Sequence, residues 1–276
     1  RDSSEYISTS NYEWANSTSS NWSGGNAAHS GANISGNAND DAIKSDVTFS
    51  GDFTVEGWYN TIKNKNGASY GFGLWGNRPS SPTSGWFWEQ EISNDTMYFY
   101  YHNGSSQVNK NWSWVPDYKR WYHLAVTRSS NTIDFFVDGQ SQGSQSITDT
   151  ITAGTTLFFG YQVGMTQYDW IGYAGPQRLS NSARYTPGTN FTPPTDVWTN
   201  DSNTKLLLQN GTDGSQTFTD GSSGSHTITV NGDVRWFAPK IGTGAMALDG
   251  SGDYLNLTTS DSEVWNWGTG AYTVEG

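Results

Sequence analysis

Apolar and polar residues alternate in short runs along this chain, which is a pattern typical of β-strands. In the run "FTVEGWY" (53–59), Phe53 and Val55 alternate with Thr54 and Glu56. Successive side chains of a strand point to opposite faces, so this alternation predicts a strand with one buried and one solvated face. No window carries apolar residues at helical spacing over three turns, because Gly, Asn, Thr and Ser interrupt every candidate. The pattern therefore predicts an all-β fold.

A hairpin is predicted over residues 121–140, "WYHLAVTRSSNTIDFFVDGQ". One arm alternates around Leu124, a polar turn "RSSN" follows, and the other arm alternates around Phe135. Asp138 and Gly139 supply the next turn, since both tolerate positive φ. The apolar faces of the two arms carry Tyr122, Leu124 and Val126, and Ile133, Phe135 and Val137. Further strands are expected at 97–101, 156–161, 170–174, 205–209, 226–230 and 245–249. Short strands at this density favour a β-sandwich.

A six-residue sequence near the start of the chain is repeated at its end. "DFTVEG" (52–57) is repeated almost unchanged as "AYTVEG" (271–276). Looser matches keep the same order, so we interpret the chain as a window of about one and a quarter periods of a tandem repeat. Chance similarity in a sequence of few residue types is the alternative. The looser matches pair 247–257 with 33–43 and 220–236 with 2–14, so that residues 1–57 and 220–276 are two copies of one part of the repeat.

A Pro-rich stretch (186–204) is the natural domain boundary, because each Pro removes a donor from a sheet ladder. We expect a first domain over 1–197 that lacks its own first strand, a linker over 198–204, and a truncated second repeat over 205–276. The strand "KLLLQ" at 205–209 would open that second repeat.

Several of these motifs together resemble a known family. "FTVEGWY", "WYHLAVTRSSNTIDFFVDGQ", "LFFGY" and "WIGYAGPQRLSNSARYTPGTNFTPP" are similar to the laminin-G-like branch of the concanavalin-A-like lectin and glucanase superfamily, over about residues 33–276. The resemblance implies a jelly-roll sandwich of two antiparallel sheets, which occurs in tandem in secreted microbial surface proteins and phage fibres. Related sequences often carry acidic residues where this chain has "AGPQRLS" (174–180), so the resemblance carries no ion site onto these residues.

Composition narrows the classes of function. The 14 Trp, 15 Tyr and 12 Phe argue against disorder, and the absence of Cys excludes disulfides, thiolate metal sites and cysteine nucleophiles. A net charge of −12 makes nucleic acid and anionic membrane surfaces poor partners. No apolar run approaches the roughly 18 residues of a membrane span, so no membrane insertion is expected.

Paired carboxylates raise the question of catalysis. Glu89 and Glu91 stand at alternate positions, as in retaining glucanases of the resembled superfamily, but the third acidic position is Ser93. The triplet is broken, so no catalytic residues and no enzyme activity are expected, and a solvated strand face explains the pair. The histidines show no zinc spacing, and surface or packing roles are expected for His29, His102, His123 and His226.

Calcium is the ion best matched by the remaining acidic residues. "NANDD" supplies Asp40 and Asp41, and "DGSGD" supplies Asp249 and Asp253, at corresponding positions of the two copies. Hard cations bind clustered carboxylate and carbonyl oxygens on turns. Turn formation by Asp and Gly explains the same letters without a metal.

Aromatic residues gather in one stretch, and three interpretations of them stay open: core packing, a bead-to-bead interface, or a platform for sugars. These residues are Trp75, Trp86, Trp88, Tyr98, Tyr100 and Trp112. Glycosylation sequons are also frequent, which fits a surface protein and equally an Asn-rich β surface. The sequons are Asn16, Asn21, Asn33, Asn94, Asn103, Asn111, Asn190, Asn200, Asn210 and Asn256.

Three functions from different classes follow. The leading hypothesis is a non-catalytic extracellular structural protein whose tandem jelly-roll repeats form a fibre, a cell-surface appendage or a virion appendage. Its partners would be neighbouring copies of the repeat, joined by strand exchange or sheet-edge pairing. The alternative is a carbohydrate-binding adhesin module that recognises cell-surface glycans, and a glucan hydrolase is the third possibility.

Overall fold

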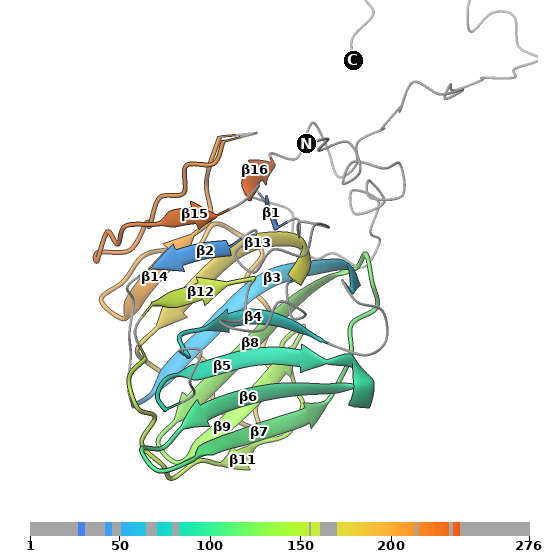
Figure 1. Cartoon of the computed structure of the whole chain (residues 1–276), viewed down its shortest axis with the longest axis vertical. Coiled ribbons are helices and arrows are strands. Elements are labelled where there is room, and N and C mark those ends of the chain that lie inside the picture. The colour runs from blue at the N-terminus through green and yellow to red at the C-terminus, as the bar shows by residue number, and fades with distance from the viewer. Residues whose placement is uncertain are drawn as a thin grey trace, which may run out of the picture.

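The structure, a computed structural model, is a sandwich of two antiparallel β-sheets (Figure 1). It describes residues 27–30, 42–45, 51–64, 71–78, 83–154, 156–160, 170–212, 215–231 and 234–237. Every pairing among the described strands is antiparallel. The predicted all-β sandwich is confirmed. No helix of the described residues is long and apolar enough to cross a membrane.

The first sheet is built around the long strands β3 and β13, which pair with one another. Its order is β10-β9-β8-β3-β13-β1-β16, with β14 also paired to β13 and β11 to β9. The strands span β1 Ala27–Ser30, β3 Phe53–Asn64, β8 Trp121–Ser129, β9 Thr132–Val137, β10 Gln140–Ser141, β11 Gln145–Ser146, β13 Trp170–Ser180, β14 Thr204–Leu208 and β16 Arg235–Phe237.

The second sheet has the order β15-β2-β12-β4-β5-β6-β7. Its strands span β2 Ala42–Ser45, β4 Phe72–Gly76, β5 Trp86–Glu91, β6 Thr96–His102, β7 Gln107–Ser113, β12 Leu157–Phe159 and β15 Thr229–Asn231. A short 3-10 turn, η4 Ile92–Asn94, connects β5 to β6.

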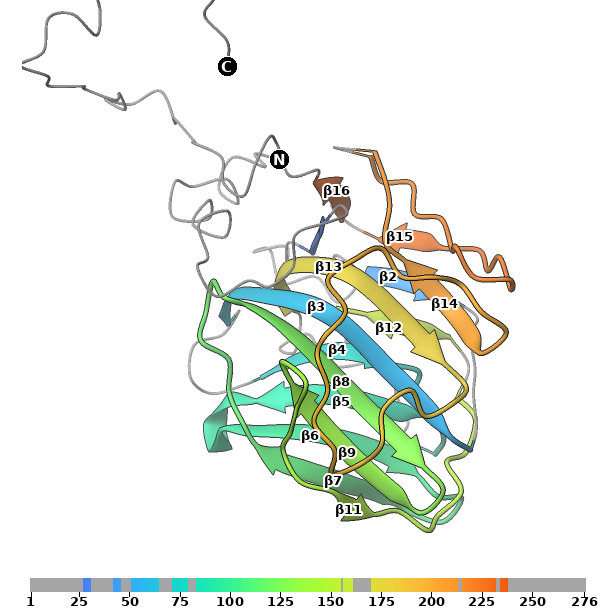
Figure 2. The same cartoon turned by 180° about the vertical axis from the view of Figure 1, so that it is seen from behind.

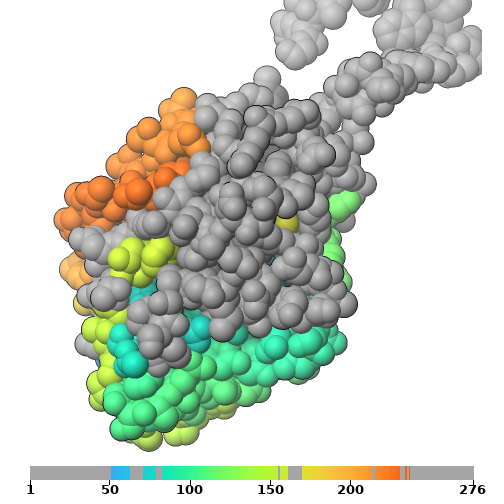
Figure 3. Space-filling model, in the orientation of Figure 1, coloured from blue at the N-terminus to red at the C-terminus, as the bar shows by residue number. Residues whose placement is uncertain are grey.

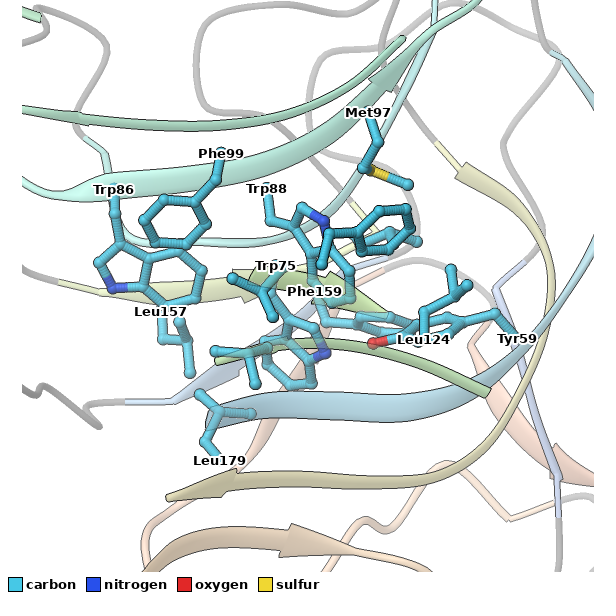
Figure 4. Packing of buried hydrophobic residues seen from close by; sticks show 14 of the residues in the cluster. Tyr59, Trp75, Trp86, Trp88, Met97, Phe99, Leu124, Leu157, Phe159 and Leu179 are labelled. Carbon is cyan, nitrogen blue, oxygen red and sulfur yellow. The ribbon is translucent and has the colours of Figure 1, made fainter. Parts of the chain in front are cut away.

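The core lies between the sheets and is rich in aromatic rings (Figure 4). The predicted hairpin is confirmed as β8 and β9, and its alternating residues face the core as expected. Asp138 and Gly139 form the predicted turn, with φ angles of 49° and 76°. In Figure 4, Trp86 and Phe99 face one another across β5 and β6, and their rings stack with centroids 5.5 Å apart. Burial of these large rings supplies most of the hydrophobic stabilisation.

The prediction of a half-solvated β3 is wrong, because both faces of the strand are buried. The segment 181–203, which connects β13 to β14, crosses the outer face of β3 and β8 (Figure 2). The backbone carbonyl of Pro194 in this segment accepts a hydrogen bond from the indole N–H of Trp58, at 3.1 Å. We call residues 181–203 the connecting segment. It gives the first sheet a second, smaller apolar layer, which includes Trp58, Trp121, Tyr173, Trp198 and Leu207.

The strand expected to open a second domain joins this sandwich instead. Residues 204–208 form β14, which pairs with β13. Leu206 and Leu208 are buried in the main core. The expected boundary at 198–204 therefore does not separate the described residues into two sandwiches, since apolar side chains of β14 fill the same interior. The expected strand at 245–249 lies outside the described residues.

Candidate functional site

Four of the six aromatic candidates belong to the core. Trp75, Trp86, Trp88 and Trp112 are at most 4% exposed and belong to the core cluster. Figure 4 shows the first three among the other rings of this cluster. Trp75 donates its indole N–H to the side-chain oxygen of Gln177, at 3.0 Å. The sugar-platform and interface interpretations do not hold for these tryptophans, because their rings are buried in the core between the sheets.

Tyr98 and Tyr100 take the opposite orientation. In β6, Met97, Phe99 and Tyr101 face the core, so Tyr98 and Tyr100 stand on the outer face, where both are half-buried. Their rings stack on each other with centroids 5.0 Å apart and an angle of 16° between planes. The pair forms a rigid aromatic ridge on the outside of the second sheet.

Amide side chains flank this ridge. Across β6 and β7, Tyr98 lies opposite Asn111 and Tyr100 opposite Asn109. Asn111 donates an amide N–H to the side-chain oxygen of Asn109 at 3.1 Å, and Asn94 donates one to the hydroxyl of Tyr98 at 2.9 Å. We call Tyr98, Tyr100, Asn94, Asn109 and Asn111 the Tyr98/Tyr100 face. All three amides are exposed to solvent.

Charged side chains lie at both ends of β5 beside this face. Burial raises the pKa of Glu89 to about 8, the positive charge of Arg78 opposes this shift and the negative charge of Glu91 adds to it. Glu89 is therefore largely protonated at neutral pH. Glu91 is partly exposed and accepts a hydrogen bond from the hydroxyl of Ser93 at 3.2 Å.

The alternation of Glu89 and Glu91 does not continue to a third position on the strand. β5 ends at Glu91, and Ser93 lies in η4, where the chain already turns toward β6. At the other end of β5, the guanidinium of Arg78 lies 5.6 Å from the ring centroid of Phe87 and donates to the side chain of Gln107 at 2.8 Å.

The Tyr98/Tyr100 face combines two partly exposed aromatic rings with three exposed amides. Aromatic rings present apolar faces that pack against C–H groups, and amides both donate and accept hydrogen bonds. Strand β5 is almost wholly buried, whereas alternate residues of β6 and most residues of β7 reach the surface, in the lower, green part of Figure 3. The arrangement suits a neutral, hydroxyl-rich ligand.

A second cluster, which the sequence analysis missed, is buried on the outer face of the first sheet. The carboxylate of Glu56 accepts hydrogen bonds from Arg178 Nε at 2.8 Å and from the hydroxyl of Tyr185 at 2.5 Å. His123 Nε2 lies 3.3 Å from the same carboxylate. Burial raises the pKa of Glu56, but the hydrogen bond from His123 and the charges of Arg178 and His123 outweigh it and lower the pKa to about 2.

The cluster fixes the connecting segment to the sheet. Tyr185 belongs to this segment, as does Arg184, which also binds Asp201 through two hydrogen bonds of 2.8 and 2.9 Å. A charged residue in the middle of an apolar strand, Glu56 within "FTVEGWY", is the sequence signal that could have revealed it. His123 lies on the strand face opposite the core, as expected, but it is fully buried because the connecting segment covers it.

The ion and glycosylation predictions have different outcomes. Asp40, Asp41, Asp249 and Asp253 lie outside the described residues, as do Asn16, Asn21, Asn33 and Asn256. In the part of the chain that the structure describes, no three His, Asp or Glu residues gather as a metal site would require. Glycosylation stays a prediction for the remaining sequons. Asn94, Asn111, Asn190, Asn200 and Asn210 are exposed, and Asn103 is half-buried.

Sequence comparison identifies the family. The Laminin_G_3 model, which describes the concanavalin A-like lectin/glucanases superfamily, matches residues 35–185, more than half of the chain. The chain belongs to this family, and the resemblance derived from its motifs is confirmed. No curated protein matches the chain by sequence.

One solved structure shares the fold at low sequence identity, and others are similar over part of the chain. A proposed carbohydrate binding protein from Bacteroides ovatus aligns over 77% of this chain and 59% of its own length, with a TM-score of 0.54 and 14% identity. Domains LG4-5 of the mouse laminin alpha1 chain align over 63% of this chain and 47% of their own, at a TM-score of 0.45 and 12% identity. The carbohydrate binding module CBM66 of Bacillus subtilis aligns over 50% of this chain and 78% of its own length, with a TM-score of 0.34 and 16% identity.

Proposed function

We propose that this chain is a non-catalytic carbohydrate-binding module that holds glycans on the Tyr98/Tyr100 face. The observation that carries the proposal is the stacked tyrosine pair on an accessible sheet face, bordered by three exposed amides. The Bacteroides ovatus protein of similar fold, itself described as a proposed carbohydrate binding protein, supports this choice. A module of this kind acts outside the cell, on a cell or virion surface.

Charge favours neutral over acidic sugars. Glu89 is largely protonated at neutral pH, but Glu91 remains a partly exposed carboxylate next to the face. The chain as a whole carries a net charge of −12. Sialic acid or uronic acid residues would therefore be repelled by Glu91, whereas neutral hexoses and N-acetylhexosamines carry no charge for it to repel.

Binding to a glycan array, followed by calorimetry with the best neutral ligand, tests the proposal. Tyr98→Ala and Tyr100→Ala should each weaken binding by at least tenfold, about 1.4 kcal/mol, because a truncated ring removes a central contact. Tyr118→Ala is the matched control, since Tyr118 is a 43% exposed tyrosine outside the face. Absence of binding to any glycan, or equal affinity in all three variants, would refute the proposal.

A second function is favoured by a separate observation. Strands β14, β15 and β16 close the sandwich, although their sequence resembles the opening of a further repeat. We propose that the module is one bead of a tandem array in an extracellular fibre or surface appendage, with copies of the repeat as its partners. Electron microscopy of the native assembly would show beads at a regular spacing, and isolated particles of one sandwich would contradict the array.

A further inference from the structure

We infer that residues 204–237, which by sequence open the second repeat, are the closing strands of the first sandwich, so that successive repeats interlock by strand donation. The inference rests on the tandem array proposed above and names how its partners bind one another. The donated strands β14, β15 and β16 lie together at one end of the two sheets (Figures 1 and 2).

The donated segment enters the first sheet beside its longest pairing. β14 pairs with the second half of β13, in a register that places Leu206 opposite Leu179 and Leu208 opposite Gln177. The first half of β13 pairs with β1 from the start of the chain. Without residues 204–208, the backbone of β13 at 177–180 would lose the ladder on that side.

The same segment continues to the edges of both sheets. β15 pairs with β2 at the end of the second sheet, and β16 pairs with β1 at the end of the first. The two short N-terminal strands therefore each lie between an internal strand and a strand of the donated segment. Strands β15 and β16 cover the edges that β2 and β1 would otherwise leave open.

Side chains of the donated segment fill the shared core. Leu206, Leu208, Val234 and Trp236 are each at most 2% exposed within the main apolar cluster. The ring of Trp236 stacks on that of Phe218 with centroids 4.6 Å apart, and its indole N–H donates to the carbonyl of Thr217 at 3.1 Å. Burial of this extent is that of an integral strand.

The buried carboxylate of Asp220 stabilises the turn between β14 and β15 by hydrogen bonds. One oxygen of Asp220 accepts from the backbone N–H of Leu207 at 2.9 Å and of Ser222 at 2.8 Å. The other accepts from the N–H of His226 at 2.9 Å and from the hydroxyl of Ser222 at 2.7 Å. The donated segment is therefore stabilised by its own hydrogen bonds. It pairs with the sandwich through β14 before this turn and through β15 and β16 after it.

If the sequence repeats, the same packing would occur between every pair of neighbouring repeats in the array. Residues 220–236, inside the donated segment, loosely match residues 2–14, which precede β1. A repeat that begins with such a segment donates it backwards to the sandwich before it. Neighbouring beads would then be joined by hydrogen-bonded sheets and a common core, and pulling them apart would require unfolding one of them.

Hydrogen exchange measured by mass spectrometry on the full chain tests the inference. In Leu206→Ala, protection factors of peptides from β3 and β13 should fall at least about 30-fold together with those of 204–237, because one cooperative unit loses a buried side chain. Val197→Ala, at a residue 55% exposed in the connecting segment, is the control and should leave all protection unchanged.

Faster exchange confined to 204–237, with β3 and β13 unaffected, would overturn the inference, since residues 204–237 would then unfold as a separate unit. Should Leu206→Ala fail to fold, the milder Leu206→Val takes its place, with a smaller fall shared by the same peptides. The readout does not involve sugars or array formation. Absence of glycan binding would refute the proposed carbohydrate-binding function, and isolated particles of one sandwich would refute the proposed array. Neither result would change the hydrogen exchange measured in this test.

Discussion

Replacing Glu56 with Gln should cost the sandwich roughly 3 kcal/mol of unfolding free energy at neutral pH. The carboxylate is fully buried and accepts from Arg178 and Tyr185, with His123 Nε2 at 3.3 Å. A glutamine side chain at this position would keep the shape but leave the guanidinium of Arg178 without its counter-charge. Removing one partner of a buried ion pair typically costs about 3 to 5 kcal/mol.

The pKa of Glu56 gives an independent magnitude. Hydrogen bonding from His123 and the charges of Arg178 and His123 overcome the burial of this carboxyl and lower its pKa from 4.5 to about 2. At about 1.4 kcal/mol per pKa unit, this difference corresponds to roughly 3 kcal/mol. The carboxylate is favoured in the folded state, so this stabilisation is complete above pH 4.5 and is lost as the pH falls from 4.5 through 2.

Urea unfolding followed by near-ultraviolet circular dichroism, at several pH values, is the assay. The gap between the parent chain and Glu56→Gln should be widest at about pH 6 to 7 and should narrow below about pH 4.5. Glu91→Gln is the matched control, because Glu91 is partly exposed and should change stability by no more than about 0.5 kcal/mol. A Glu56→Gln loss below about 1 kcal/mol, or a gap independent of pH, would refute the argument that this cluster fixes the connecting segment.

Two further predictions concern the second sheet. Trp88→Ala should lower the unfolding free energy by about 3 to 5 kcal/mol, since the indole is fully buried between the sheets, and a loss under about 1 kcal/mol in thermal or urea unfolding would contradict its place in the core. Glu89→Gln should raise stability, because burial lifts the pKa of this carboxyl to about 8 and folding therefore disfavours its ionised form. That gain should be absent below about pH 4.5 and grow as the pH rises toward about 8, so an equal effect at the two ends of this range would exclude it.

Local sequence was sufficient to specify the strands and the faces that they bury in the hairpin. Alternation around Leu124 and Phe135 predicted β8 and β9, and the Asp138-Gly139 turn follows from residues that tolerate positive φ. These features are local, since a strand's own period and a turn's own backbone decide them. The family could be recognised for a similar reason, because its motifs are continuous stretches of sequence, each covering one strand, a hairpin, or a strand with the segment that follows it.

The face proposed to bind glycans was only partly visible in the sequence. The aromatic stretch was singled out, but sequence alone could not separate Trp86 and Trp88 from Tyr98 and Tyr100. Both pairs alternate within strands, and alternation says which residues share a face without saying which face is inside. The packing of the two sheets made that choice, since it buried the tryptophans and left the tyrosines outside.

Long-range contacts decided the rest. Glu56 was assigned to a solvated face because nothing near it in sequence shows that residues 181–203 return across β3. Likewise, "KLLLQ" was assigned to a second domain because a Pro-rich stretch precedes it, whereas its pairing with β13 depends on backbone partners that no local pattern encodes. Local patterns specify strands and turns, and only the tertiary structure specifies which strands share a sheet, because pairing and burial join residues that lie far apart along the chain.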